Sequence, residues 1–146
     1  MRHQIISHVY RWAHGLSRRI GLPPYIVVHI SVSGPNTTVS DIDSWHKQRG
    51  YSGIGYHAVI YPNGKIVRGR PWWAMGAHCL GHNECLGVCF ISMAGKITSE
   101  QIAAGRWLIH RWRRKCHIPS TRVKRHRDMS GNSTSCPGVL PMDKVR

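Results

Sequence analysis

Residues 55–70 read Gly-Tyr-His-Ala-Val-Ile-Tyr-Pro-Asn-Gly-Lys-Ile-Val-Arg-Gly-Arg, and this stretch predicts a β-hairpin. The pair Asn63-Gly64 tolerates the positive φ angles of a tight turn, and a mainly apolar segment stands on each side of it. The two arms of a hairpin must run antiparallel. The hairpin therefore places at least one antiparallel pair in the fold.

Two further strands and two helices are expected around the hairpin. The apolar run over residues 25–30 predicts a strand buried on both faces, and residues 86–92 predict another. Ser40 is expected to cap a helix that ends near Gly50, and Thr98-Ser-Glu-Gln resembles the capping box of a helix that reaches about residue 116. Because the connections outside the hairpin are long enough to cross over, we expect a single α/β domain with a central mixed sheet flanked by helices.

The N-terminal segment has a different character. Residues 1–20 carry apolar side chains at helical spacing, with four arginines between them and no acid. This pattern predicts a basic amphipathic helix that packs on the domain, binds an anionic envelope, or does both. We therefore expect a helical extension over residues 1–24 and a main domain over residues 25–146.

Composition and charge limit the classes of function. The chain has 146 residues, 41% of them hydrophobic, and a formal net charge of +15 from 21 basic and 6 acidic residues. This charge favours polyanionic partners. No run of 18 apolar residues exists, which argues against a transmembrane protein, and the N-terminus lacks the apolar core of a signal peptide, so we expect synthesis in the cytosol.

Histidine and cysteine residues offer a possible metal site. His29 ends the first buried strand, while His126 and Cys136 bracket a polar loop that can bring both toward one point. Two imidazoles and one thiolate would leave the fourth position of a zinc ion open, as in catalytic sites. The alternative for His29 is a hydrogen-bonded core histidine.

A rival metal cluster lies between His78 and Cys89. Its C-x5-C-x3-C spacing does not match the usual zinc knuckles, and Cys89 falls inside a predicted strand. We therefore expect Cys89 to be a core residue and Cys79 and Cys85 to be free or joined in a local bridge.

Seven motifs occur in one fixed order along the chain. They are Ile26-Val-Val-His29, Asp43-x-Trp45-His46, Arg49-Gly-Tyr-x-Gly-Ile-Gly-Tyr56-His57, Asn63-Gly-x-Ile-x-x-Gly69-Arg70, Gly76-Ala-His78-x-x-Gly-x-Asn83, Gly87-Val88, and His126-Arg-Asp128 with Cys136-Pro-Gly. This set resembles the zinc N-acetylmuramoyl-L-alanine amidase family, which includes amidase-type phage lysozymes and peptidoglycan recognition proteins. The match extends from about residue 25 to residue 140, so the resemblance identifies residues 25–146 as the catalytic domain.

The resemblance implies specific roles for several residues. One zinc ion is expected on His29, His126 and Cys136, with Tyr56 and Thr134 as the catalytic side chains. The implied reaction is hydrolysis of the amide between N-acetylmuramic acid and L-alanine in peptidoglycan. His78 and Asn83 are expected to contact the substrate. Gly50, Tyr51 and Arg68 correspond to family positions that recognise diaminopimelate-type stem peptides, although Tyr51 stands where those members have tryptophan. The alternative for Arg68 is a solvated strand residue. His46 and His57 are expected to have structural or surface roles.

The overall interpretation is a monomeric, phage-type endolysin that acts on the bacterial cell wall. Anionic envelope polymers are expected partners of the basic N-terminal helix. One alternative is a non-catalytic peptidoglycan receptor on the same scaffold, although such receptors commonly lose a zinc ligand. The other is a nucleic-acid-binding regulator, motivated by the basic run over residues 106–127, which lacks any recognised nucleic-acid-binding motif.

Overall fold

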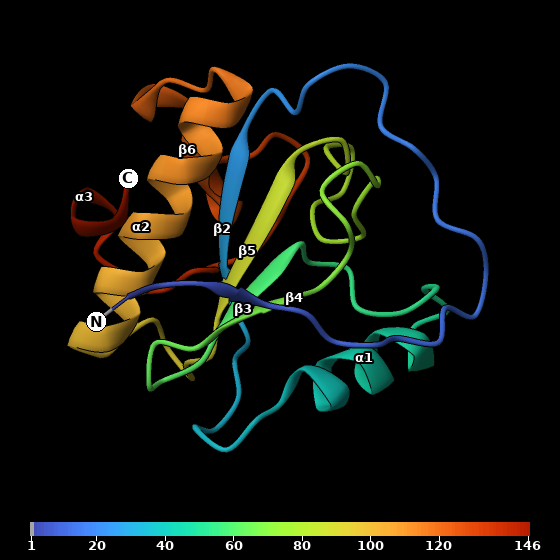
Figure 1. Ribbon diagram of the computed structural model, residues 1–146, viewed down its shortest axis with the longest axis horizontal. Helices are drawn as coiled ribbons and strands as arrows, with labels where there is room; N and C mark the ends of the chain where they lie inside the picture. The colour runs from blue at the N-terminus through green and yellow to red at the C-terminus, as the bar shows by residue number, and fades with distance from the viewer. Residues whose placement is uncertain (1) are drawn as a thin grey trace.

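A six-stranded mixed sheet forms the centre of the computed structural model, which describes residues 2–146 (Figure 1). The strands lie in the order β1-β4-β3-β5-β2-β6. Their bounds are β1 (Ile5–Ile6), β2 (Ile26–Ile30), β3 (Ala58–Ile60), β4 (Ile66–Arg68), β5 (Leu86–Phe90) and β6 (Val123–Arg125). Only β3 and β4 pair antiparallel, and they are the predicted hairpin. The remaining pairs are parallel, so the expected mixed sheet is confirmed.

Helices cover both faces of the sheet. The helices are α1 (Val39–Gln48), α2 (Ser99–Cys116) and α3 (Met142–Val145), with short 3-10 helices at Ser120–Arg122 and His126–Asp128. Helix α2 packs its apolar side chains on the face that carries Val28 and Ile60, and α1 packs Ile42 on the opposite face beside Val59 (Figure 1). The strands β2 and β5 are buried throughout because layers cover them on both sides.

The capping signals of the two long helices are only partly as predicted. Helix α2 begins with the predicted capping box, in which Thr98 and Gln101 bond each other's backbone N–H groups. Helix α1 is capped by Thr38 and not by Ser40. The side chain of Thr38 accepts from the Asp41 N–H while the Asp41 carboxylate accepts from the Thr38 N–H. This reciprocal pair satisfies two free donors. Asp43, which would be the N3 residue of a cap at Ser40, instead accepts from the Ile54 N–H and pairs with Lys47.

The predicted N-terminal amphipathic helix is wrong, because residues 2–20 form no helix. Strand β1 pairs with the edge strand β4, and the chain then crosses the domain, where the Ala13 N–H donates to the Ser52 carbonyl at 2.7 Å. Ile5 packs against the core on the α2 face, but Tyr10 and Trp12 pack on the α1 face. One helix cannot place a single apolar stripe on two faces of a sheet, so tertiary packing outweighs the helical spacing.

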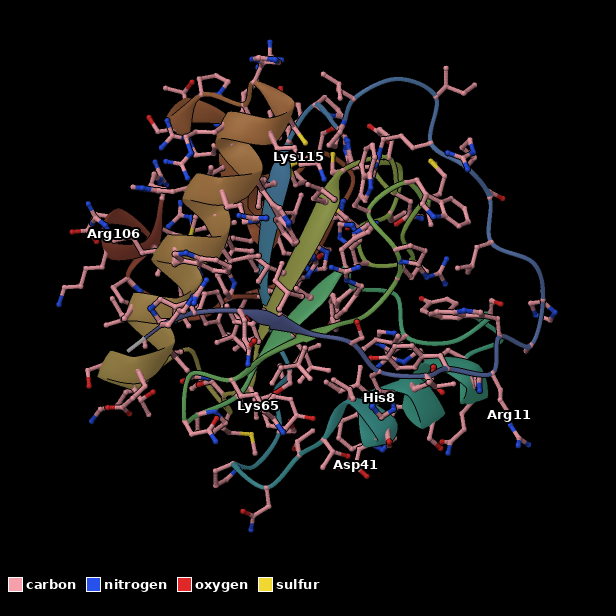
Figure 2. All side chains as sticks on the ribbon, in the orientation of Figure 1. His8, Arg11, Asp41, Lys65, Arg106 and Lys115 are labelled. Carbon is pink, nitrogen blue, oxygen red and sulfur yellow. The ribbon has the colours of Figure 1, made fainter. Side chains whose placement is uncertain are left out.

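Cations dominate the molecular surface. Arg11, Lys65 and Arg106 project outward from three different parts of the fold (Figure 2). Across residues 2–146 only two side-chain ion pairs form, Lys47 with Asp43 and Arg125 with Asp128. Most basic groups therefore have no acidic partner within the protein. Among the described residues, no helix is both long enough and apolar enough to cross a bilayer.

Candidate active site

The metal-binding atoms of His29, His126 and Cys136 lie within 4.8 Å of one another. His29 stands near the carboxyl end of β2, and His126 directly follows β6, the strand that pairs with β2. Cys136 comes from the loop that follows. In the part of the chain that the structure describes, no other group of three histidine, cysteine or acidic side chains is placed so closely. The sheet thus brings together the three ligands that the sequence predicts.

The environment of His29 and His126 favours neutral imidazoles. Burial, reinforced by the neighbouring His78, lowers the pKa of His29 well below its usual value. Burial also lowers the pKa of His126. A neutral imidazole offers a lone pair to a metal, so both rings have the protonation state that a ligand needs at neutral pH.

Cys136 completes this donor set. Its Sγ accepts a hydrogen bond from the Ile30 N–H at 3.3 Å, while burial raises the pKa of the thiol. All three side chains line a cleft of about 830 Å³, so one side of the group faces open space. Two imidazoles and one thiol with a free fourth direction fit a zinc ion of the catalytic type.

Tyr56 lies in the same cleft. The centroid of its ring is 5.0 Å from that of His29 and 5.2 Å from that of His46. Burial raises the pKa of Tyr56 well above its ordinary value, so the phenol keeps its proton. The hydroxyl can therefore act as a hydrogen-bond donor at the candidate metal centre.

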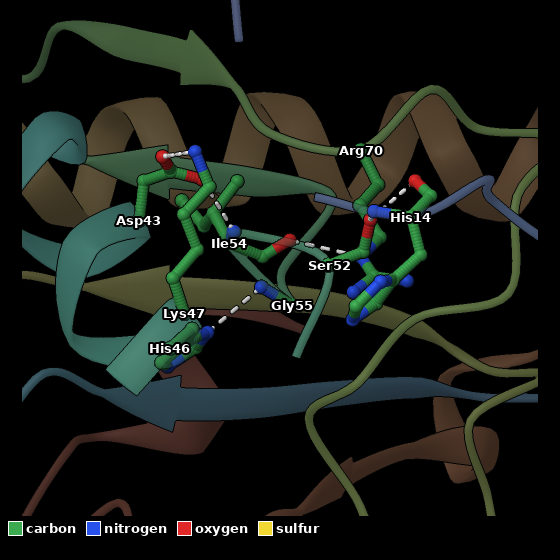
Figure 3. Close-up of polar contacts among 8 residues, drawn as sticks. All are labelled: His14, Asp43, His46, Lys47, Ser52, Ile54, Gly55 and Arg70. Atoms are coloured by element: carbon green, nitrogen blue, oxygen red, sulfur yellow. Dashed lines mark hydrogen bonds and ion pairs between the residues drawn. The ribbon is translucent and has the colours of Figure 1, made fainter. Parts of the chain in front are cut away.

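The loop before Tyr56 is anchored to α1 (Figure 3). The Ile54 N–H donates to Asp43 at 2.7 Å, and the Gly55 N–H donates to Nδ1 of His46 at 2.8 Å. At Gly55 a Cβ atom would lie 2.0 Å from the carbonyl oxygen of Ala77, so only glycine fits. These contacts hold the backbone that places Tyr56.

Thr134 and the predicted substrate residue Tyr51 also line the cleft, whereas Gly50 does not. The hydroxyl of Thr134 accepts from the Cys136 N–H at 3.1 Å, which leaves its own proton free to donate. Tyr51 is 37% exposed on the cleft wall, and Gly50 precedes it at φ +90° after the end of α1. The positive φ explains the glycine at this position.

His78 and Asn83 border the cleft but are largely engaged within the protein. The two ring nitrogens of His78 lie 2.9 Å from Nε2 of His29 and from the Cys85 carbonyl oxygen. The side-chain oxygen of Asn83 accepts from the N–H groups of His78 and Cys79. These contacts shape the loop that forms one wall of the cleft.

Arg68 lies away from the other predicted site residues. It lines a separate groove, together with Arg2 and Arg111, and does not line the cleft that holds His29. Arg68 ends β4, and its paired residue Ala58 packs in the core on the α2 face. The structure therefore does not bring Arg68 together with the candidate metal ligands.

The rival cysteine cluster does not form a metal site among residues 2–146. Cys79, Cys85 and Cys89 are free and buried, and Cys89 is a core residue of β5, as expected. Cys79 and Cys85 were expected to be free or joined in a local bridge, and in the structure both are free thiols.

Among the cleft residues that were not predicted, His46 and Asn132 lie against candidate site residues. His46 was assigned a structural or surface role, yet it lines the cleft beside Tyr56. The motif Asp43-x-Trp45-His46 was the available signal for it. Asn132 lies in the polar loop between two candidate ligands and bonds His126 at 2.9 Å. An asparagine in a loop of Ser, Gly and Asn carries no distinguishing sequence signal.

His57, by contrast, is buried between the Ala74 carbonyl and the Gly87 N–H, in the expected structural role.

Comparison with known proteins shows which family the chain belongs to. The sequence profile of the N-acetylmuramoyl-L-alanine amidase family matches residues 19–139. This chain belongs to that family. Within it, the solved structure of the endolysin N-acetylmuramoyl-L-alanine amidase LysCS from Clostridium intestinale superposes with a TM-score of 0.89 at 37% identity. The superposition covers 97% of this chain and 92% of that amidase.

Phage endolysins are similar in sequence. The endolysin of Enterobacteria phage K11 is 29% identical over 120 residues, which cover 75% of this chain and 77% of that protein. The endolysin of Escherichia phage T7 is 39% identical over 69 residues, which are 45% of this chain and 46% of the phage protein. The matched part thus spans about half the length of the T7 protein.

Proposed function

We propose that this protein hydrolyses the amide between N-acetylmuramic acid and L-alanine in bacterial peptidoglycan, with one zinc ion, as a phage-type endolysin. The main support for the proposal is that the metal-binding atoms of His29, His126 and Cys136 lie within 4.8 Å of one another at an open cleft. Membership in the amidase family and the similarity to endolysins support the choice of substrate and bond.

The chain supplies both ligands and hydrogen-bond donors for this reaction. His29, His126 and Cys136 would hold zinc, which when bound activates water at neutral pH and polarises a carbonyl. Tyr56 and Thr134 both line the cleft, and the Tyr56 phenol keeps its proton because burial raises its pKa. They would donate hydrogen bonds to the oxygen that gains negative charge as the amide is attacked. Tyr51 and Asn83, on the cleft walls, would contact the peptide or sugar.

The test of this proposal is the appearance of free N-terminal L-alanine when the protein digests purified peptidoglycan. Chelator should abolish the release and added zinc should restore it. Cleavage at another bond would instead produce new reducing sugar ends or different peptide termini. Such products, with no N-terminal L-alanine, would contradict the proposal.

The receptor alternative makes a different prediction for the same assay. A receptor would bind wall fragments without releasing alanine. The presence of Cys136 beside both histidines favours the enzyme, because a site without hydrolysis has no need for a complete donor set. Binding of peptidoglycan by zinc-loaded protein without release would favour the receptor.

Anionic envelope polymers are proposed partners of a basic groove. The N-terminal segment contributes Arg2 and His3 to this groove of about 710 Å³, which Arg68, Trp107 and Arg111 complete. No acidic side chain lines it. The ring of Trp107 packs against His3 and under the Arg111 guanidinium, so it is not free to stack on a nucleobase. A phosphate-bearing polymer would therefore bind this groove through charge and not through base stacking.

Charge substitutions can test the groove without removing the N-terminal strand. The double variant Arg68→Gln/Arg111→Gln should bind purified lipopolysaccharide less well than Arg106→Gln/Arg114→Gln, which loses the same charge from exposed sites outside the groove. Equal losses would show that net charge alone determines binding. Tighter binding to duplex DNA than to lipopolysaccharide would favour the nucleic-acid alternative.

The remaining expectations concern the organisation and location of the protein. We propose that residues 25–146 hold all the catalytic groups, that residues 1–24 complete the sheet edge and the basic groove, and that the protein acts as a monomer. Since the proposed substrate is peptidoglycan, its site of action is the bacterial cell wall. Light scattering during gel filtration tests the monomer.

A further inference from the structure

A chain of two hydrogen bonds leads from His29 to a backbone carbonyl. Nε2 of His78 lies 2.9 Å from the carbonyl oxygen of Cys85, and Nδ1 of His78 lies 2.9 Å from Nε2 of His29. A carbonyl oxygen can only accept, so Nε2 of His78 carries a proton. In a neutral His78 ring, Nδ1 must then accept, and Nε2 of His29 must donate.

The same reasoning applies to His126 through Asn132. The side-chain nitrogen of Asn132 donates to the carbonyl oxygens of Leu80 and Ser130, at 2.9 Å and 3.2 Å. This fixes the orientation of the amide, because both partners can only accept. The amide oxygen therefore accepts from the Leu80 N–H and from Nε2 of His126, at 3.1 Å and 2.9 Å.

Both candidate ligands thus have the same ring state. Each donates from Nε2, and when neutral each has its lone pair on Nδ1. Each imidazole is also held at a defined rotation by a partner that is itself fixed to backbone. His78 is 9% exposed and His29 is 1% exposed, so water competes little for these bonds.

We propose that His78 and Asn132 are positioning residues that fix the tautomer and rotation of His29 and His126, so that both present Nδ1 to the metal. This inference rests on the proposed zinc site. It gives His78 a role behind the metal ligands in place of the substrate contact expected from its motif. It also assigns a role to Asn132, which ties the Leu80 loop to the loop that carries Cys136.

The first test reads the tautomers in zinc-free protein. Long-range proton–nitrogen correlation spectra of protein labelled with ¹⁵N-histidine distinguish Nε2–H from Nδ1–H rings. At pH 7.5 the wild-type protein should show His29 and His126 only as Nε2–H. Substitution His78→Phe should leave His29 as a mixture, and Asn132→Leu should do the same for His126. A mixture in the wild-type protein, or Nδ1–H at either ring, would overturn the proposal.

The second test measures zinc affinity by competition with a chelating indicator. The variants His78→Phe and Asn132→Leu should bind zinc about 10- to 100-fold more weakly, the usual effect of removing a partner of a metal-bound histidine. His78→Gln and Asn132→Asp keep an acceptor for the ligand ring, so they should restore most of the affinity. These conservative variants separate positioning from misfolding.

A matched control separates tautomer control from loop anchoring. His82 also ties the two loops together, through Nε2 and the Ser130 carbonyl oxygen at 2.9 Å, but it does not contact either ligand. The variant His82→Phe should keep wild-type zinc affinity. A loss equal to that of Asn132→Leu would overturn the proposal in favour of simple loop anchoring. Failure of the wild-type protein to bind zinc would refute the proposed function, while the tautomer spectra would still test the positioning bonds.

Discussion

The backbone N–H of Ile30 donates to Sγ of Cys136 at 3.3 Å, although the two residues are 106 positions apart. This bond joins the end of β2 to the loop that brings Cys136 beside His29. It favours the thiolate, but burial dominates and raises the pKa of Cys136. The metal-free protein therefore holds a neutral thiol at pH 7.

Zinc binding should consequently release a proton from Cys136. His29 and His126 are already neutral at pH 7 because burial lowers their pKa values, so they release none. In the variant Cys136→Asp the same burial raises the pKa of the carboxyl, but from a usual value of about 3.9, so the group is ionised at pH 7. A pH indicator in weak buffer should therefore detect about one more proton per bound zinc from the wild-type protein than from Cys136→Asp. Equal release from both proteins would mean that Cys136 is not the ligand.

Tyr56→Phe should reduce turnover and leave zinc binding intact. The ring stays in its packed position, but the hydroxyl donor is lost at the cleft. Loss of one donor to a developing oxyanion lowers kcat by about 10²- to 10³-fold. Steady-state kinetics on soluble wall fragments should show this loss in kcat with little change in KM. An unchanged kcat would exclude the hydroxyl from the reaction.

Metal-free protein should lose stability as the pH falls below about 6.5. Burial lowers the pKa values of His29, His46, His57, His78 and His126, with His46 and His78 at about 4. At pH values between these folded pKa values and the unfolded value of about 6.5, the unfolded chain binds more protons than the folded protein. Each extra bound proton lowers the free energy of unfolding by about 1.4 kcal/mol for each unit by which the pH falls.

Urea denaturation of zinc-free protein measures this effect. The free energy of unfolding should be lower at pH 5 than at pH 7. Equal or greater stability at pH 5 would show that these histidines are not held in their neutral form.

Gly105→Ala should destabilise the protein even though alanine favours helices. Gly105 lies in α2 against Phe90, where a Cβ atom would come within 2.5 Å of the ring. Overpacking a buried contact costs about 1–3 kcal/mol, more than the roughly 1 kcal/mol that alanine gains over glycine in a helix. Thermal unfolding should therefore show a lower Tm. Gly15→Ala, which meets no atom within 4 Å, should leave Tm unchanged.

The sequence predicts the centre of this fold better than its edges. The Asn63-Gly64 turn and the buried runs over residues 25–30 and 86–92 are local signals, and the structure has the hairpin and both strands. The helix prediction for the N-terminal segment is wrong because its apolar residues have helical spacing, while the core residues they pack against lie on two faces of the sheet. Such partners are not visible in a local pattern.

The site also contains residues that the sequence predicts and residues that it does not. The resemblance carried by the seven ordered motifs made His29, His126 and Cys136 predictable, and the structure brings these three residues together. Asn132 was missed because its role depends on the orientation of one amide between two loops. Arg68 was grouped with the cleft residues because the motif gives its position in the chain but not the side of the sheet it occupies.

The N-terminal strand changes how the role of this segment should be tested. Removing residues 1–20 would expose the edge of β4 and delete Arg19, whose buried guanidinium donates to the carbonyls of Trp72, Ala74 and Glu84. Such a truncation would reduce stability together with any binding of the envelope. Charge substitutions in the basic groove avoid this difficulty.

The most direct test of the central claim is the release of N-terminal L-alanine from purified peptidoglycan. Four samples are compared: native protein, chelator-treated protein, the same protein with zinc restored, and Cys136→Ala. We predict release by the native and zinc-restored samples and none by the other two. Release that persists after verified zinc removal, or in Cys136→Ala, would contradict a zinc amidase built on His29, His126 and Cys136.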